Sequence, residues 1–348
     1  MSEPAHSTAT ATATTGLEAD DNADTPATAG TRRAPPMIEA ESVRRAKRRI
    51  ALVTIWVPTF GAALALGLAI VHGVSVLQVS LLVAMYIVTM TGVEVGFHRF
   101  FAHRSFKGGE IVRALLGIAG SMAVQGPVTY WAATHRRHHI YSDTKEDPHS
   151  PHVRKASDGS EQRFRGRLAG LWHSQMGNMY TDHATNVMAF ARDLARDPIT
   201  VFVAKHYRKW VLLGLVLPAL IGAAVERSWY GALLGLLWGG LLRIFIVHHI
   251  YFASGSFSHM YGGRRFQTDD ESTNNYVFGV PTFGSAWQNN HHAFPLSAVL
   301  GFKWYEPDVG ALIIRTLAAL GLVTDVKRMP TAHEQARKAK VPAKAVRL

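Results

Sequence analysis

The stretch THRRHHIYSDTKEDPHSPH, residues 134–152, decides how the rest of the chain is interpreted. Within it, His135, His138 and His139 are spaced i, i+3 and i+4, so on a helix they lie on one face. Imidazole is the commonest metal ligand in proteins and suits iron, zinc and copper. The spacing therefore predicts a helix that presents two or three imidazoles to a metal.

Three further histidine groups lie outside this stretch. His98 and His103 are five residues apart, which would make them diverge on a straight helix and suits a helix end better. His259 stands alone, and His291 and His292 are neighbours about 100° apart on a helix, so they can serve two metals. A two-metal, mostly imidazole centre accounts for these clustered histidines better than a single ion does.

Four long apolar runs separate the histidine groups, and a helix that crosses a bilayer needs about 20 such residues. The four runs are residues 50–72, 75–96, 210–225 and 229–252. They form two hairpins, and the third run is short and contains Pro218. A fifth apolar run, 111–128, is broken by Gly126-Pro127, so we expect it to be buried or interfacial rather than spanning.

Basic residues set the orientation of these spans. The first span is preceded by Arg44, Arg45, Lys47, Arg48 and Arg49. The positive-inside rule then places the N-terminus in the cytoplasm. Counting the crossings places residues 97–209 and 253–348 there as well, together with the C-terminus and every clustered histidine. We predict a multi-pass integral membrane protein whose histidines lie on its cytoplasmic side.

Composition narrows the kinds of partner and site. The chain has no cysteine, which excludes thiolate-bound zinc, cysteine-ligated iron–sulfur clusters and disulfides. The net charge is +12, and much of the basic charge flanks apolar segments. That placement favours an anionic membrane surface and acidic substrates over nucleic acid, so we expect no nucleic-acid partner.

Both ends of the chain are expected to be tails around one domain. Residues 1–43 begin with a segment rich in Ala, Thr, Asp and Pro without apolar periodicity, which predicts a disordered N-terminal tail. Residues 331–348 contain several lysines and predict a basic, solvated C-terminal tail. Residues 44–330 form the membrane domain.

The chain resembles the membrane fatty acid desaturases of the acyl-CoA (stearoyl-CoA) type, and its bacterial members in particular. Besides residues 134–152, the matching stretches are GFHRFFAHRSF at 96–106, RIFIVHHIYF at 243–252, SHMYGGRRFQTDDESTNN at 258–275 and WQNNHHAFPLSA at 287–298. The resemblance extends over roughly residues 48–330. It implies an all-α integral membrane fold, with four transmembrane helices under a cytoplasmic helical cap that holds a His-rich di-iron site.

The resemblance also implies a reaction. A non-haem centre of two iron ions would use O2 to remove two hydrogens from an unactivated position of a fatty acyl chain, leaving a cis double bond. The expected substrate is an acyl thioester, acyl-CoA in particular, docked on a basic surface that suits its phosphates. Because the chain has no cysteine for a cluster and no dinucleotide fingerprint, we expect electrons from a separate ferredoxin or cytochrome with its reductase.

The resemblance assigns the clustered histidines to two irons. The ligands of one iron correspond to His98, His103, His135, His139 and His291, and those of the other to His138, His259 and His292. Where the family has a ninth histidine this chain has Gln288, and where it has an asparagine this chain has Gly255. Both departures fall on the second iron. The Gln288 carbonyl is a weaker ligand than imidazole, but its spacing from His291 and His292 lets it face the site.

Acidic residues near the histidines are candidates to support the metal. Glu94 lies four residues before His98 on the same helical face. It can supply charge or a ligand near the second metal, or simply pair with Arg99. Asp143 and Asp147 are expected to orient imidazole N–H groups.

Other polar residues are given subsidiary roles. His248 and His249 end the fourth span and are expected to line the cavity or to bond groups around the metal. His149 and His152 are expected to belong to a turn near the site rather than to bind metal. Arg243, an ionisable residue inside a span, points to a function or to an ion pair near the membrane surface.

Three residues are expected to contact the acyl chain. Trp131, four residues before His135, is a candidate wall of the substrate tunnel. Related desaturases tend to have histidine at the position of Gln175 and tryptophan at that of Asn178, beside the tunnel. These differences affect the expected chain length and double-bond position rather than the class of reaction.

Three alternative functions remain open at this point. The altered second iron site fits a hydroxylase or a desaturase of a specialised substrate. It also fits a catalytically silent relative that binds lipid. A membrane hydrolase or zinc transporter is disfavoured, because transporters usually place their ligands within spans. Since histidine must be neutral to bind metal, we expect metal binding to weaken as the pH falls through about 6.5.

Overall fold

The computed structural model describes residues 37–181 and 183–339. All of them belong to one compact unit, Ala34–Leu348, whereas a second unit, Met1–Arg33, lies outside the described residues. Most of the predicted N-terminal tail is therefore outside this description. Its last residues form strand β1, Met37–Ile38, and begin helix α1 at Glu41.

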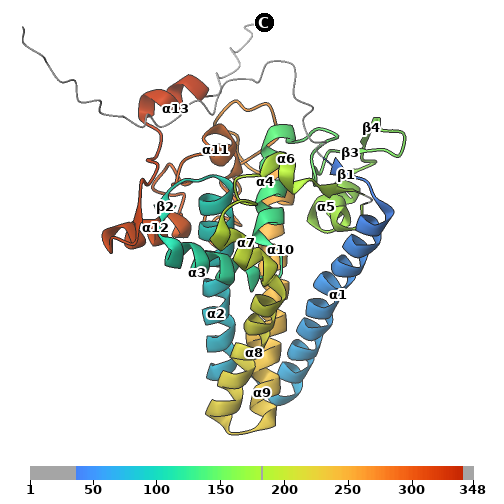
Figure 1. Cartoon of the computed structure of the whole chain (residues 1–348), viewed down its shortest axis with the longest axis vertical. Helices are drawn as coiled ribbons and strands as arrows, with labels where there is room; N and C mark the ends of the chain where they lie inside the picture. Colours follow the sequence, from blue (N-terminus) through green and yellow to red (C-terminus); the bar gives the residue numbers. More distant parts are fainter. Residues whose placement is uncertain (1–36, 182, 340–348) are drawn as a thin grey trace, which may run out of the picture. The chain divides into compact units, whose positions relative to one another are not determined.

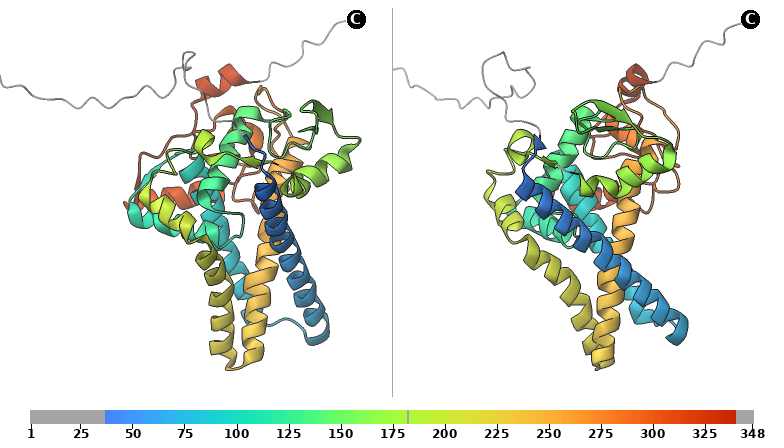
Figure 2. Two further views of the ribbon diagram at one scale, coloured as in Figure 1. Left: turned by 45° about the vertical axis from the view of Figure 1, so that its right-hand side comes forward. Right: turned by 90° about the vertical axis from the view of Figure 1, so that its right-hand side faces the viewer.

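Four long helices, among the described residues, are apolar and long enough to cross a membrane: Glu41–His72, Val76–Ala102, Tyr207–Glu226 and Trp229–His259. The predicted spans are thus helices, each longer than the apolar run that predicted it. In element terms they are α1 (Glu41–His72), α2 (Val76–Met90) with η1 (Thr91–Ala102), α8 (Tyr207–Glu226), and α9 (Trp229–Gly235) continuing through η3 (Leu236–Leu242) and α10 (Arg243–Ser256) to η4 (Phe257–His259). Figure 2 shows α1 lying beside α10.

The two helices of the last hairpin pack through small residues. A Cβ atom at Gly222 of α8 would lie 2.2 Å from the carbonyl oxygen of Gly231 in α9. Likewise, a Cβ atom at Gly235 would lie 2.2 Å from the carbonyl oxygen of Pro218. Small residues let helix backbones approach closely within a membrane, where the hydrophobic effect does not drive helices together. The short, proline-containing third span is therefore held directly against the fourth.

The remaining elements, here called the cap (residues 103–206 and 260–339), lie at one end of the four long helices (Figure 1). Its helices are α3 (Glu110–Ser121), α4 (Val128–Tyr141), α5 (Arg167–Gln175), η2 (Gly177–Tyr180), α6 (Val187–Phe190), α7 (Pro198–Lys205), α11 (Gln288–Ala293), α12 (Val309–Ala319) and α13 (Ala332–Lys338). The strands, over the described part of the chain, form three antiparallel pairs: β1 with β5 (Ala184–Thr185), β2 (Lys107–Gly108) with β6 (Val323–Thr324), and β3 (Val153–Lys155) with β4 (Glu161–Arg163). The fold is mostly helical, as predicted.

One segment of the cap agrees with what the sequence suggested, and a second differs from it. The apolar run 111–128 becomes α3, which is too short to span, and the chain re-enters a helix only after Gly126-Pro127. Within the predicted C-terminal tail the chain forms α13, whose N-terminus has a capping box between Thr331 and Glu334. Residues 340–348 of that tail lie outside the described residues.

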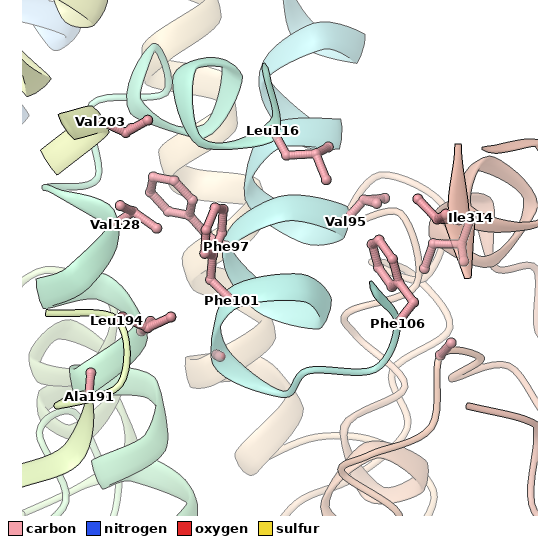
Figure 3. Packing of buried hydrophobic residues seen from close by; sticks show 14 of the residues in the cluster. Val95, Phe97, Phe101, Phe106, Leu116, Val128, Ala191, Leu194, Val203 and Ile314 are labelled. Carbon is pink, nitrogen blue, oxygen red and sulfur yellow. The ribbon is translucent and has the colours of Figure 1, made fainter. Parts of the chain in front are cut away.

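The cap is attached to the long helices by a hydrophobic core around η1. Figure 3 shows Val95 and Phe106 on the side of Ile314 in α12, and Phe97 and Phe101 on the side of Val128 in α4. All six of these side chains are at most 2% exposed. Since His98 lies within this rigid segment, the core fixes the position of the first clustered histidine.

Candidate metal centre

Five imidazoles from three parts of the fold converge on one point. They belong to His98 in η1, His103 just after it, His135 and His139 in α4, and His291 in α11. Their ligating atoms all lie within 4.8 Å of one another. Successive Nε2 atoms are 2.7 Å (His103 to His135), 3.0 Å (His135 to His139), 2.9 Å (His139 to His291) and 2.9 Å (His291 to His98) apart. We call these five residues the first group.

These spacings fit a metal ion. Two nitrogens that bind one ion at roughly 2.1 Å and at right angles lie about 3.0 Å apart. Five rings cannot all place an N–H at one point, so most of the converging nitrogens present lone pairs. A cation between them is the natural partner of such lone pairs.

The π-helical winding of η1 explains how His98 and His103 meet. The backbone N–H of His103 donates to the carbonyl oxygen of His98, an i to i+5 bond 3.1 Å long. This bond is the signature of a π-helix, which is frequent at functional sites. It brings the two ring centroids to 4.9 Å. The five-residue spacing predicted that this pair lies at a helix end, which is correct. On a straight α-helix, however, the two rings would point apart.

Three more imidazoles form a second group: His138 in α4, His259 in η4 and His292 in α11. Their ligating atoms also lie within 4.8 Å of one another. The two groups are adjacent, because the rings of His139 and His292 have centroids 4.4 Å apart. The structure therefore divides the eight histidines between two points as the resemblance implied.

Each imidazole of the second group has its own carboxylate. The Nδ1-to-carboxylate distances are 3.0 Å (His138 to Asp147), 2.9 Å (His259 to Asp143) and 2.5 Å (His292 to Asp270). A carboxylate that accepts from one ring nitrogen fixes the tautomer and leaves the other nitrogen free for metal. The Nε2 atoms of His259 and His292 are indeed buried without a hydrogen-bond partner in the described structure. Buried polar atoms are rarely left unpaired, so these two nitrogens fit a missing ligand such as a metal.

Burial keeps five of these imidazoles in the neutral form that metal binding needs. It lowers the pKa values of His103, His135, His139 and His291 well below that of free histidine, and neighbouring histidines add to the effect. Burial also lowers the pKa of His292 to about 4, against the opposing influence of its carboxylate. These imidazoles are therefore neutral near pH 7.

The carboxylates behind the second group are ionised. Burial raises the pKa of Asp147, but the charge of His138 and the hydrogen bond from it outweigh this and bring the pKa to about 2. Asp143 and Asp270 also have lowered pKa values, because His259 and His292 respectively outweigh burial. The second group is thus poorer in imidazoles but richer in negative charge than the first.

Comparison with known proteins agrees with this geometry. The profile of the family described as "Fatty acid desaturase" matches residues 75–318. This chain belongs to the fatty acid desaturase family. Members of this family are oxidoreductases, so the chain is an enzyme of that class.

Three relatives show the range of substrates within the family. The chain is 43% identical over 276 residues to hex-5-enoyl-[acyl-carrier protein] acetylenase of Moorena producens (strain JHB), covering 79% of this chain and 84% of that protein. It is 34% identical over 239 residues to sn-1 stearoyl-lipid 9-desaturase of Anabaena variabilis, covering 68% and 78%. It is 33% identical over 254 residues to icosanoyl-CoA 5-desaturase of Limnanthes douglasii, covering 72% and 64%.

Glu94 of the desaturase lies behind the first group rather than among the metal-facing atoms of the second. Its carboxylate accepts from Nδ1 of His98 at 2.9 Å and from Nε of Arg99 at 2.9 Å. The hydroxyl of Tyr251 donates to the same carboxylate at 3.2 Å. Of the roles considered for Glu94, the structure therefore favours the pairing with Arg99 and adds the orientation of His98.

The other predicted supporting residues lie at different distances from the two groups. Asp143 and Asp147 contact imidazoles of the second group, as described above. His248 instead bonds the carbonyl oxygen of Ala123 at 2.8 Å. With His249 it lines a small cavity between α1 and α10, and neither histidine belongs to a metal-facing group among the described residues.

The predicted acyl-chain residues occupy separate places. Trp131 stacks on His135, with ring centroids 5.2 Å apart, so it forms a wall of the first group. Gln175 joins α5 to α10, since its amide donates to the carbonyl oxygen of His249 and its carbonyl accepts from Ser256. Asn178 donates to the last turn of α5, at the carbonyl oxygens of His173 and Ser174. Of these three predicted residues, Trp131 is the one that contacts a metal-facing imidazole.

One residue of the centre, Asp270, was not predicted from the sequence. It lies in the loop between η4 and α11, within the TDDEST stretch, where no helical period marks the position of a side chain. The only available signal was an acidic residue between two histidine motifs. By contrast, His152 lies in an irregular segment near the site, as expected, because its Nε2 atom bonds the carbonyl oxygen of His259 at 2.7 Å.

Proposed function

We propose that this desaturase uses two non-haem iron ions and O2 to introduce a cis double bond into a fatty acyl chain carried as a thioester. The observation that carries the proposal is the convergence of five Nε2 atoms beside a second group of three imidazoles. Imidazole suits iron, and two adjacent sites suit chemistry on one substrate. The family of the chain supports the same reaction.

The two irons would be held by the two groups. The first iron is assigned to His98, His103, His135, His139 and His291, and the second to His138, His259 and His292. Gln288 is proposed as a further ligand of the second iron. It lies in α11 one turn before His291 and His292, and its Oε1 atom is buried with no hydrogen-bond partner in the part of the chain described. An acceptor oxygen left unpaired in this position is what a metal ion would satisfy.

The chain's own residues prepare the site for the irons, which when bound would supply the activation of O2. Asp143, Asp147 and Asp270 hold the Nδ1 protons of the second group and so keep its Nε2 lone pairs available. Glu94 does the same for His98. Trp131 closes one side of the first group by stacking on His135.

The substrate and the electron donor are proposed from the sequence and the relatives. We infer an acyl thioester, with CoA as the carrier that the sequence favours. One relative is named for a substrate on acyl carrier protein and another for an acyl-CoA, so both carriers are used by similar proteins. Electrons would come from a separate ferredoxin or cytochrome with its reductase. We further propose that the cap and both termini face the cytoplasm, because basic residues precede α1.

A second candidate product is a triple bond formed from an existing double bond. The 43% identity to an acetylenase favours it. In both reactions the enzyme removes two hydrogens from adjacent carbons. The two candidates differ in substrate, so they can be separated by supplying saturated and unsaturated chains.

The test uses the purified, iron-loaded protein with a ferredoxin, its reductase, NADPH and O2. Saturated and monounsaturated chains are supplied as CoA thioesters, as carrier-protein thioesters and as phospholipid vesicles, and the products are identified by gas chromatography and mass spectrometry. An O2-dependent alkene from a thioester supports the proposal, and a product from vesicles alone would overturn the thioester carrier. A hydroxylated chain would replace desaturation by hydroxylation. Metal binding without any product would favour a lipid-binding relative.

A further inference from the structure

His149 lies beside the second group although neither the sequence nor the family resemblance gave it a metal-binding role. Its ring stacks on that of His138, with centroids 4.4 Å apart and planes inclined by 28°. The ligating atoms of His138, Asp147 and His149 lie within 4.8 Å of one another. These contacts make His149 the next imidazole outward from the second group.

The ring of His149 fills the space above Gly255. A Cβ atom at Gly255 would lie 3.3 Å from Cε1 and 3.5 Å from Nδ1 of His149. Gly255 precedes His259 by four residues at the junction of α10 and η4, so this space borders the second group. A side chain at position 255 would compete with the imidazole for it.

Asp147 ties His149 to the second group without fixing its ring. The carboxylate accepts from Nδ1 of His138 and, through Oδ1, from the backbone N–H of His149 at 3.0 Å. The Nδ1 atom of His149 lies 3.9 Å from the same oxygen, which is too far for a hydrogen bond. The backbone is therefore held next to His138, while the ring remains able to turn about its side-chain bonds.

We propose that His149 is an additional ligand of the second metal. This inference rests on the proposed function, because it assumes that the three-imidazole group binds an ion. The first group supplies five imidazoles and the second only three. With Gln288 and His149 the second ion would also have five protein ligands. The bound ion would draw the His149 ring from its stack on His138 toward the second group.

The first test removes the imidazole of His149. Purified wild type, His149→Ala and His149→Phe are loaded with iron or cobalt, and the ions per chain and the dissociation constant of each ion are measured. The phenylalanine variant keeps a stacked ring but cannot bind metal. We expect both variants to bind the second ion at least about tenfold more weakly, while the dissociation constant of the first ion stays unchanged. Added imidazole should restore tight binding in His149→Ala, where the ring leaves a space, and not in His149→Phe.

The second test displaces the ring without removing it. Gly255→Val places methyl groups against His149, whereas Gly263→Val is the matched control, because nothing lies within 4 Å of a Cβ at Gly263. We expect weaker binding of the second ion, with a changed cobalt absorption spectrum, in the first variant only. Unchanged binding of both ions in His149→Ala and His149→Phe would overturn the inference while leaving the proposed function intact. A wild-type chain that binds no second ion would overturn both.

Discussion

The Nδ1 atom of His292 lies 2.5 Å from Oδ2 of Asp270, so a carboxylate from an irregular loop orients an imidazole of the second group. Burial raises the pKa of Asp270, but the hydrogen bond from His292 outweighs this effect, so the carboxylate is ionised. Such a partner holds the ring and increases its basicity toward a metal. Asp270 therefore contributes to the candidate metal centre without facing the metal itself.

We expect Asp270→Asn to weaken binding of the second ion by roughly 10- to 100-fold and to leave the first ion in place. The amide has a similar volume but lacks the negative charge that polarises His292. Metal per chain, measured after dialysis against increasing chelator, reports the change. Asp269→Asn, at the exposed neighbouring position, is the matched control and should keep both ions. Equal loss of both ions from Asp270→Asn would contradict this role.

Position 288 should control how firmly the second ion is held. We expect two irons per chain in anaerobically purified wild type, a loss of the second in Gln288→Ala, and tighter retention in Gln288→His, because imidazole is the stronger ligand. Iron analysis of the three proteins measures this directly. One iron in the wild type, rising to two in Gln288→His, would mean that Gln288 does not hold the second ion. The lipid-binding or altered-chemistry alternatives would then gain support.

The parts of this fold that could be predicted from sequence are those marked by a helical spacing of residues or by the length of an apolar run. The spans follow from apolar runs about 20 residues long, since a helix satisfies all of its own backbone hydrogen bonds within a bilayer. The spacing of His135 and His139 follows from the α-helix. The meeting of His98 with His103 could not be predicted in the same way, because it depends on π-helical winding. Asp270 and His149 reach the second group from irregular segments, whose paths only tertiary contacts determine.

Arg99 should be important for stability, because it joins η1 to the C-terminal part of the cap. Its buried guanidinium bonds Glu94, Asp308 and the carbonyl oxygen of Ala298. Removing one partner of a buried ion pair typically costs about 3–5 kcal/mol. We expect Arg99→Met to lower the thermal unfolding midpoint in detergent by many degrees and to disturb the first ion through Glu94 and His98.

The control for Arg99 is an ion pair on the surface. Arg328 pairs with Glu334 at 2.8 Å, but both side chains are largely exposed, so solvent screens the interaction. Arg328→Met should leave the unfolding midpoint nearly unchanged. If the two variants unfolded at the same temperature, the buried Arg99 network would not be the stabilising contact that its geometry indicates.

The metal-free desaturase should lose stability as the pH falls below about 6.5. Histidine in an unfolded chain titrates near 6.5, whereas burial lowers the folded-state pKa values of His103, His135, His139 and His291 well below that. Below pH 6.5 the unfolded state therefore binds protons that the folded state does not, and the free energy of unfolding decreases. Asp147, with a pKa of about 2, stays ionised throughout this range and does not offset the loss.

Thermal unfolding in detergent at pH 7, 6 and 5 measures this effect, with and without bound metal. The midpoint of the metal-free protein should fall steadily between pH 7 and pH 5, and a His135→Gln/His139→Gln variant should show a shallower fall, because two of the four titrating groups are gone. Because these pKa values are lowered, protons should compete with metal for the first group only at a pH below the value of about 6.5 that the sequence suggested. The first ion should therefore be retained at pH 6. Two results together would show that these imidazoles are not buried in their neutral form: release of the first ion at pH 6, and a thermal unfolding midpoint of the metal-free protein that does not change with pH.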